Sequence, residues 1–170
     1  RQRQMCIRDS YSAGYGGRIL GIASSNMRYN YIGIDPNTET VKHLSYLQEL
    51  IQQAIGSETK IIQTVSEEYE PENIDLAFSS PPYFNLEKYS DEETQCMVRY
   101  KTIDEWFEGY VEPTMANIRR GLNSDGLFAT NISDYKTAKE EFQVVDRWIQ
   151  TAEKIGFTFN GMIKMMLNTR

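Results

Sequence analysis

A serine, two prolines and a tyrosine follow one another at the end of a short apolar run, Ile74–Ser79. They are Ser80, Pro81, Pro82 and Tyr83. Proline has no N–H and a fixed φ, so the two prolines stiffen the segment and present carbonyl oxygens as hydrogen-bond acceptors. The serine hydroxyl adds another acceptor, and the tyrosine ring can stack on a nucleic-acid base. The alternative interpretation is a turn that ends a strand, with a tyrosine packed in the core.

A second candidate site is a glycine-rich stretch near the start of the chain. Ala13-Gly14-Tyr15-Gly16-Gly17, called the glycine loop below, leads into a short helix candidate at Arg18–Ala23. Glycines let the backbone approach a ligand closely, beside a helix N-terminus, as nucleotide-type cofactors require. Asp35 follows the next predicted strand, Tyr29–Ile34, roughly 20 residues later, where an acid reaches the ribose hydroxyls of an adenosine-containing cofactor. The alternative to a cofactor site is structural: the glycines form an ordinary turn, and Asp35 belongs to an Asp-Pro turn in which Asn37 caps the next helix.

With these neighbours, residues 75–83 resemble the catalytic motif of amino-group DNA methyltransferases, in which Asp, Asn or Ser precedes Pro-Pro and an aromatic residue. The resemblance implies a Rossmann-like α/β fold with a mostly parallel sheet, helices on both faces and S-adenosyl-L-methionine as the cofactor. It implies that Ser80 and Pro81 accept hydrogen bonds from the exocyclic amino group of cytosine (N4) or adenine (N6), while Tyr83 stacks on the flipped base. The implied cofactor-binding residues are Ala13, Gly14, Gly16, Asp35, Ser66 and Glu67.

The resemblance leaves several alternatives open. Serine in the first motif position is commoner among cytosine enzymes, whereas a glycine loop before the motif is commoner among adenine enzymes. Methylation of RNA or of a protein glutamine amide uses related motifs that usually begin with Asn, and a catalytically inactive cofactor-binding subunit is a third alternative. Ser66 and Glu67 carry over loosely, because a solvated acidic turn suits them equally well.

Short apolar runs alternate with helical patterns along the chain, which predicts a parallel α/β sheet. Apolar residues at helical spacing predict a helix from about Asn37 to Ile55 that ends at Gly56. Capping boxes predict helix starts at Thr102–Glu105 and at Thr137–Glu140. Further strands are predicted over residues 60–65, 74–79, 126–132 and 157–166.

This topology makes a prediction about the two candidate sites. Ligands of open α/β sheets bind beyond the carboxyl ends of the strands. Ser80, Pro82 and Tyr83 should therefore face the same cleft as Gly14, Gly16 and Asp35. Trp106, Phe107 and Tyr110 are expected in the core, and His43 on an exposed helix face.

The bulk properties fit one folded domain rather than a disordered chain, with 170 residues, 40% hydrophobic and 25% charged. No apolar run approaches the ~18 residues of a membrane span, and Cys6 and Cys96 have no metal-ligand spacing. We therefore expect no membrane segment, no metal site and a cytoplasmic location. The net charge of -6 opposes the proposed DNA partner, since duplex binding relies on basic residues. If DNA is the partner, we expect either a local basic face or a recognition domain or partner subunit outside this chain.

The first ten residues resemble a translated sequencing adapter. The run CGGCAGCGTCAGATGTGTATAAGAGACAG, read in frame, gives the first nine residues, and Ser10 straddles the junction. We expect a non-native tail over residues 1–10 and a methyltransferase domain, truncated at both ends, over residues 11–170. The strand before the glycine loop is central in this fold, and residues 5–7 are the one apolar run available for it. Because charged residues flank that run, we expect a chain that is unstable or aggregated and that binds S-adenosylmethionine weakly or not at all.

Overall fold

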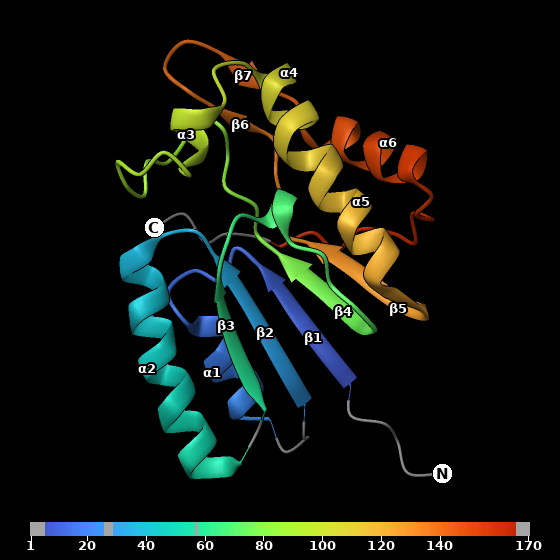
Figure 1. Ribbon diagram of the computed structural model, residues 1–170. Helices are drawn as coiled ribbons and strands as arrows, with labels where there is room; N and C mark the ends of the chain where they lie inside the picture. The colour runs from blue at the N-terminus through green and yellow to red at the C-terminus, as the bar shows by residue number, and fades with distance from the viewer. Residues whose placement is uncertain (1–5, 26–28, 57, 166–170) are drawn as a thin grey trace.

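Five parallel strands form the centre of the molecule, in the order β3-β2-β1-β4-β5 (Figure 1). The computed structural model describes residues 6–25, 29–56 and 58–165. The strands are β1 (Cys6–Tyr11), β2 (Tyr29–Asp35), β3 (Thr59–Gln63), β4 (Ile74–Ser79) and β5 (Leu122–Thr130). Because all neighbours are parallel, the carboxyl ends of the strands share one edge of the sheet.

Helices lie on both faces of this sheet, with α1 and α2 on one side and α4, α5 and α6 on the other (Figure 1). A 3₁₀ turn, η1 (Ser66–Glu68), follows β3, and a π-helical turn, η2 (Phe107–Val111), joins α4 to α5. The helices are α1 (Gly17–Ala23), α2 (Thr38–Ile55), α3 (Cys96–Arg99), α4 (Ile103–Trp106), α5 (Glu112–Gly121) and α6 (Val145–Ile155). The predicted fold class, a mostly parallel α/β sheet with helices on both faces, is confirmed.

The buried side chains divide between the two faces. Tyr31 of β2 packs with Ile19 and Leu44 of the α1–α2 layer, whereas Ile34 of the same strand packs with Ile118 of α5. An aromatic cluster contains the expected core residues Trp106, Phe107 and Tyr110, which are all buried, together with Val144 and Trp148. The two faces of β2 therefore carry two cores, as expected of a central strand in a covered parallel sheet.

The caps of two helices were correctly predicted because they are local signals. Asn37 caps α2, and its side-chain oxygen accepts from the N–H of Thr40 at 2.8 Å. The Thr102 hydroxyl accepts from the N–H of Glu105 at 3.1 Å and opens α4. These bonds satisfy amides that the first turn of a helix leaves free.

The predicted helix start at Thr137 is wrong. Thr137 Oγ1 accepts from the N–H of Glu140 at 3.1 Å, as an N-cap would, but the chain turns back on itself. It forms a hairpin of β6 (Tyr135–Lys136) and β7 (Glu141–Phe142), and the next helix, α6, begins at Val145. The rings of Tyr135 and Phe142 stack with centroids 4.9 Å apart, which stabilises the hairpin.

The strand predicted over residues 157–166 is also wrong within residues 157–165, the part that the structure describes. Phe157 packs against Phe128 of β5, with ring centroids 5.3 Å apart, but Phe159 and Ile163 are exposed. A strand needs a partner for its backbone groups, and no described segment pairs with this one. Its β-forming composition alone does not make it a strand.

Two strands extend beyond their predicted limits. β5 begins at Leu122, so the residues 123–125 that were expected to form a turn lie in the strand, where its register with β4 shifts. The backbone of β1 pairs with β2 and β4 from Cys6 onward, which confirms that residues 6 and 7 fill the central position. Met5 lies outside the described residues.

Within the described part of the chain, no helix combines the length and apolarity needed to cross a membrane.

Candidate functional site

The glycine loop turns sharply at the carboxyl end of β1. The N–H groups of Ser12 and Ala13 both donate to the carbonyl oxygen of Ile34, at 3.1 and 2.8 Å, which ties the loop to β2. Gly14 and Gly16 have φ values of 62° and 92°, in the left-handed region that glycine adopts without strain. The loop is therefore tied to the end of β2, with Ala13 and Gly16 buried and Gly14 half-buried.

Asp35 lies at the end of β2 and is joined to this loop. One carboxylate oxygen accepts from the N–H of Gly14 at 3.1 Å, and the other accepts from the N–H of Asn37 at 3.1 Å. Burial raises the pKa of Asp35, and these two amides partly offset the rise. A carboxylate oxygen can accept more than one hydrogen bond, so Asp35 retains the capacity to accept from two ligand hydroxyls.

Arg18, which we did not single out in the sequence, supports the loop from α1. Its guanidinium donates to the carbonyl oxygen of Ser12 and lies 3.4 Å from Oγ of Ser10. The same group sits 5.2 Å from the ring centroid of Phe78 on β4. Burial lowers the pKa of Arg18. A basic residue directly after the glycines was the available signal.

The Ser-Pro-Pro-Tyr motif begins at the carboxyl end of β4, the strand next to β1. The Ser80 hydroxyl oxygen accepts from the side-chain amide of Asn131 at 3.2 Å. Pro81 is buried, and Ser80 and Tyr83 are half-buried. The phenolic oxygen of Tyr83 accepts from the N–H of Ser133 at 2.9 Å. The motif and the glycine loop thus lie at the same edge of the sheet, on adjacent strands.

The residues after β3 are held by other parts of the protein. Ser66 is buried, and the Glu67 carboxylate accepts from Arg99 at 2.8 Å and from the Tyr100 hydroxyl at 2.7 Å. The Glu67 carbonyl oxygen accepts from the side chain of Asn117. The Glu67 side chain is therefore bound by the C-terminal end of α3, and its predicted cofactor role stays a prediction.

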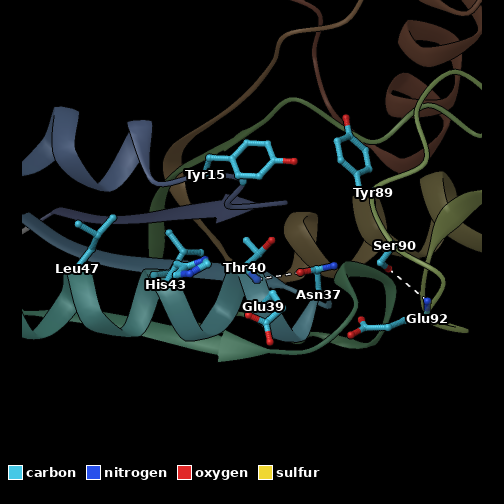
Figure 2. Close-up of a pocket in the computed structure, with 11 residues that line it drawn as sticks. Tyr15, Asn37, Glu39, Thr40, His43, Leu47, Tyr89, Ser90 and Glu92 are labelled. Atoms are coloured by element: carbon cyan, nitrogen blue, oxygen red, sulfur yellow. Dashed lines mark hydrogen bonds between the residues drawn. The ribbon is translucent and has the colours of Figure 1, made fainter.

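A pocket of about 530 Å³ lies beside the glycine loop (Figure 2). Of the predicted cofactor residues, it is lined by Gly14 alone. Figure 2 shows Tyr15 and Tyr89 on one side and side chains of α2, including exposed His43, on the other. The remaining lining residues are Asn37, Glu39, Thr40, Leu44, Leu47, Ser90 and Glu92. Neither Asp35 nor the motif lines this pocket. The motif and the glycine loop share one edge of the sheet, but the cleft predicted to hold both stays a prediction.

Three solved structures share this fold. A possible exported protein from Bordetella parapertussis aligns with a TM-score of 0.64 and 13% identity, over 92% of this chain and 56% of that one. The O-methyltransferase from a trans-AT PKS multienzyme of Brevibacillus brevis, in complex with S-adenosyl-L-homocysteine, aligns with a TM-score of 0.59 and 13% identity. The alignment covers 91% of this chain and 47% of that one. The mycolic acid cyclopropane synthase CmaA1 complexed with SAH aligns with a TM-score of 0.51 and 11% identity, over 73% of this chain and 35% of that one.

At these identities the likeness concerns the fold alone, and it agrees with the predicted Rossmann-like α/β architecture. The chain spans between 35% and 56% of the length of these three proteins. No family model matches the sequence. A search of curated proteins finds no relative by sequence.

Proposed function

We propose that this chain is the catalytic core of a DNA methyltransferase that transfers a methyl group from S-adenosylmethionine to an exocyclic amino group of cytosine or adenine. The observation that carries the proposal is the position of Ser80 to Tyr83. The motif starts where β4 ends, and β4 is the direct neighbour of β1, which leads into the glycine loop. SAH is bound in the Brevibacillus brevis O-methyltransferase and in the cyclopropane synthase, which share the fold. The choice of a nucleic-acid substrate rests on the motif.

The residues at the strand ends support this choice of cofactor. A Cβ added at Gly14 would meet the Arg18 guanidinium at 3.9 Å, an ordinary contact, and it is the φ of 62° that favours glycine there. We assign the backbone of Gly14 to the cofactor and the Asp35 carboxylate to its ribose hydroxyls. When bound, S-adenosylmethionine would supply an electrophilic methyl group, whose carbon–sulfur bond would break as the carbon–nitrogen bond forms, leaving S-adenosyl-L-homocysteine and releasing one amino proton to solvent.

The chemical task of the motif is to make a poor nucleophile reactive. The lone pair of an exocyclic amino nitrogen is delocalised into the base. The Ser80 hydroxyl and the Pro81 carbonyl oxygen accept hydrogen bonds from the amino protons, which favours a pyramidal nitrogen with a localised lone pair. Pro82 stiffens the segment, and the Tyr83 ring stacks on the flipped base and sets its position. Orientation of the amino group is thus the main contribution of these residues.

A methyl-transfer assay tests the proposal. The protein, expressed from the native full-length gene, is incubated with S-adenosylmethionine carrying a labelled methyl group and with DNA, RNA or a glutamine-containing protein as acceptor. Methylated nucleosides are then identified by mass spectrometry. We expect label in DNA, as N4-methylcytosine or N6-methyladenine, and a strongly reduced rate of labelling with the Ser80→Ala variant. Label confined to RNA or protein, or S-adenosyl-L-homocysteine binding without transfer to any acceptor, would contradict the proposed function.

A further inference from the structure

The segment that follows β5 holds both ends of the Ser-Pro-Pro-Tyr motif. At the first end, Asn131 donates its side-chain N–H to the Ser80 hydroxyl oxygen at 3.2 Å. At the second end, the backbone of Ser133 donates to the Tyr83 phenolic oxygen at 2.9 Å, and the phenol is 3.2 Å from the Ser133 carbonyl oxygen. These contacts join residues 51 and 50 positions apart. The two motif side chains are therefore fixed by the segment that follows the neighbouring strand β5.

Asn131 is itself held by the sheet. Its backbone N–H donates to the carbonyl oxygen of Ser79 at 2.8 Å, directly after the last paired position of β4 and β5, Ser79 with Thr130. This bond continues the ladder by one residue and fixes the backbone of Asn131 relative to β4. The side chain reaches Ser80 from a rigid support, which positions a group more accurately than a free loop does.

We propose that Asn131 is the positioning residue for Ser80, because its donated hydrogen bond selects the Ser80 rotamer that directs the hydroxyl oxygen at the substrate amino group. A serine oxygen accepts through two lone pairs. One is occupied by Asn131, and the other is left for the substrate. Without this contact the side chain is distributed among staggered rotamers, and the restricted backbone before Pro81 does not compensate. The inference rests on the acceptor role of Ser80 in the proposed function.

Two variants remove the donor. Asn131→Ala deletes the side chain, and Asn131→Leu keeps about its size but can neither donate nor accept a hydrogen bond. Single-turnover methyl transfer to DNA is measured with saturating labelled S-adenosylmethionine. We expect both variants to slow the methyl-transfer step at least tenfold, while the KM for DNA and the affinity for S-adenosyl-L-homocysteine stay within twofold of the unsubstituted protein.

A double-mutant cycle separates positioning from general support. If Asn131 acts through the Ser80 hydroxyl, its removal has nothing left to affect once that hydroxyl is gone. In the Ser80→Ala background, we therefore expect Asn131→Ala to change the residual rate by less than twofold. A merely structural role would slow transfer by the same factor in both backgrounds.

Asn123 provides a matched control on the same pair of strands. Its side chain donates to Asp75 at 2.9 Å and to the Asn73 carbonyl oxygen at 3.2 Å, at the opposite edge of the sheet. Asn123→Ala also removes an asparagine contact between β4 and β5. We expect it to lower the melting temperature and to leave the single-turnover rate unchanged.

The outcomes distinguish this inference from the proposed function. If the unsubstituted protein labels DNA and the two Asn131 variants match its rate, the inference is overturned and the proposed function stands. Equal effects of Asn131→Ala in the two backgrounds also overturn the inference. If the unsubstituted protein labels no nucleic acid, the proposed function fails, and the inference fails with it.

Discussion

The backbone N–H of Gly14 lies 3.1 Å from a carboxylate oxygen of Asp35, a residue 21 positions later in the sequence. This hydrogen bond joins the turn after β1 to the end of β2. Asp35 therefore shapes the loop in addition to offering acceptors to a ligand. A substitution that removes its negative charge is expected to disturb both roles.

We expect Asp35→Asn to weaken the binding of S-adenosyl-L-homocysteine at least tenfold. The new amide cannot accept from Gly14, Asn37 and two ribose hydroxyls as a carboxylate can. Isothermal titration calorimetry measures the affinity, and the Ser80→Ala variant is the control, because its change lies outside the assigned cofactor contacts. Unchanged affinity in Asp35→Asn would show that the acid does not hold the cofactor.

Ser80→Ala is expected to produce the reverse pattern. Loss of one preorganised hydrogen bond to the reacting group typically costs on the order of a hundredfold in rate. We therefore expect methyl transfer to fall by about that factor while the affinity for S-adenosyl-L-homocysteine stays within twofold. Labelled-methyl transfer under single-turnover conditions is the measurement, and full turnover by this variant would exclude the proposed hydrogen bond.

Two adjacent glycines of the glycine loop should respond differently to alanine. Gly16 has φ 92°, and a Cβ there would lie 2.6 Å from Cδ1 of Leu47, whereas a Cβ at Gly17 would have no neighbour within 4 Å. Gly16→Ala should cost about 1–3 kcal/mol from backbone strain. Gly17→Ala, at the start of α1, should be neutral or slightly stabilising. Thermal unfolding of both variants tests this, and equal melting temperatures would contradict the assigned conformation.

The parts of the fold that could be predicted from the sequence depend on nearby residues. Asn37 and Thr102 cap helices through bonds that span three positions, so the pattern and the structure coincide. The position of the motif was also predictable, because Ser80 follows an apolar run that becomes a central strand.

The missed features depend on partners distant in sequence. Residues 157–165 have the composition of a strand but no described partner, and Thr137 makes a cap-like bond inside a hairpin held by ring stacking. Tyr89 reaches the pocket only because the loop after the motif returns to α2, where Glu92 accepts from the N–H of Thr38. The contact of Asn131 with Ser80 spans 51 positions and has no local signal.

The last prediction concerns Asp9, a residue that is 2% exposed in the central strand β1. One of its carboxylate oxygens has no hydrogen-bond partner among the described residues, and the other lies 3.5 Å from the Tyr69 hydroxyl. Burial raises the pKa of Asp9 from 3.8 to about 7. A buried carboxylate without a strong partner is costly, which gives a physical basis for expecting low stability in this chain.

The sign of the pH effect follows from this raised pKa. Between pH 4 and pH 7 the folded state holds the Asp9 proton more tightly than the unfolded state, so the contribution of Asp9 to stability falls as the pH rises through this range. The full difference is roughly 4 kcal/mol. Asp9→Asn imitates the protonated form, so it should unfold at a higher temperature than the unsubstituted protein at pH 8, with a gap that narrows steadily toward pH 5. Thermal unfolding followed by circular dichroism at several pH values measures that gap, and Asp125→Asn, at an exposed position on β5, should show none. If the difference in melting temperature is absent or independent of pH, Asp9 is not buried in an ionisable form. Cooperative unfolding together with tight S-adenosylmethionine binding by the unsubstituted chain would contradict its expected instability.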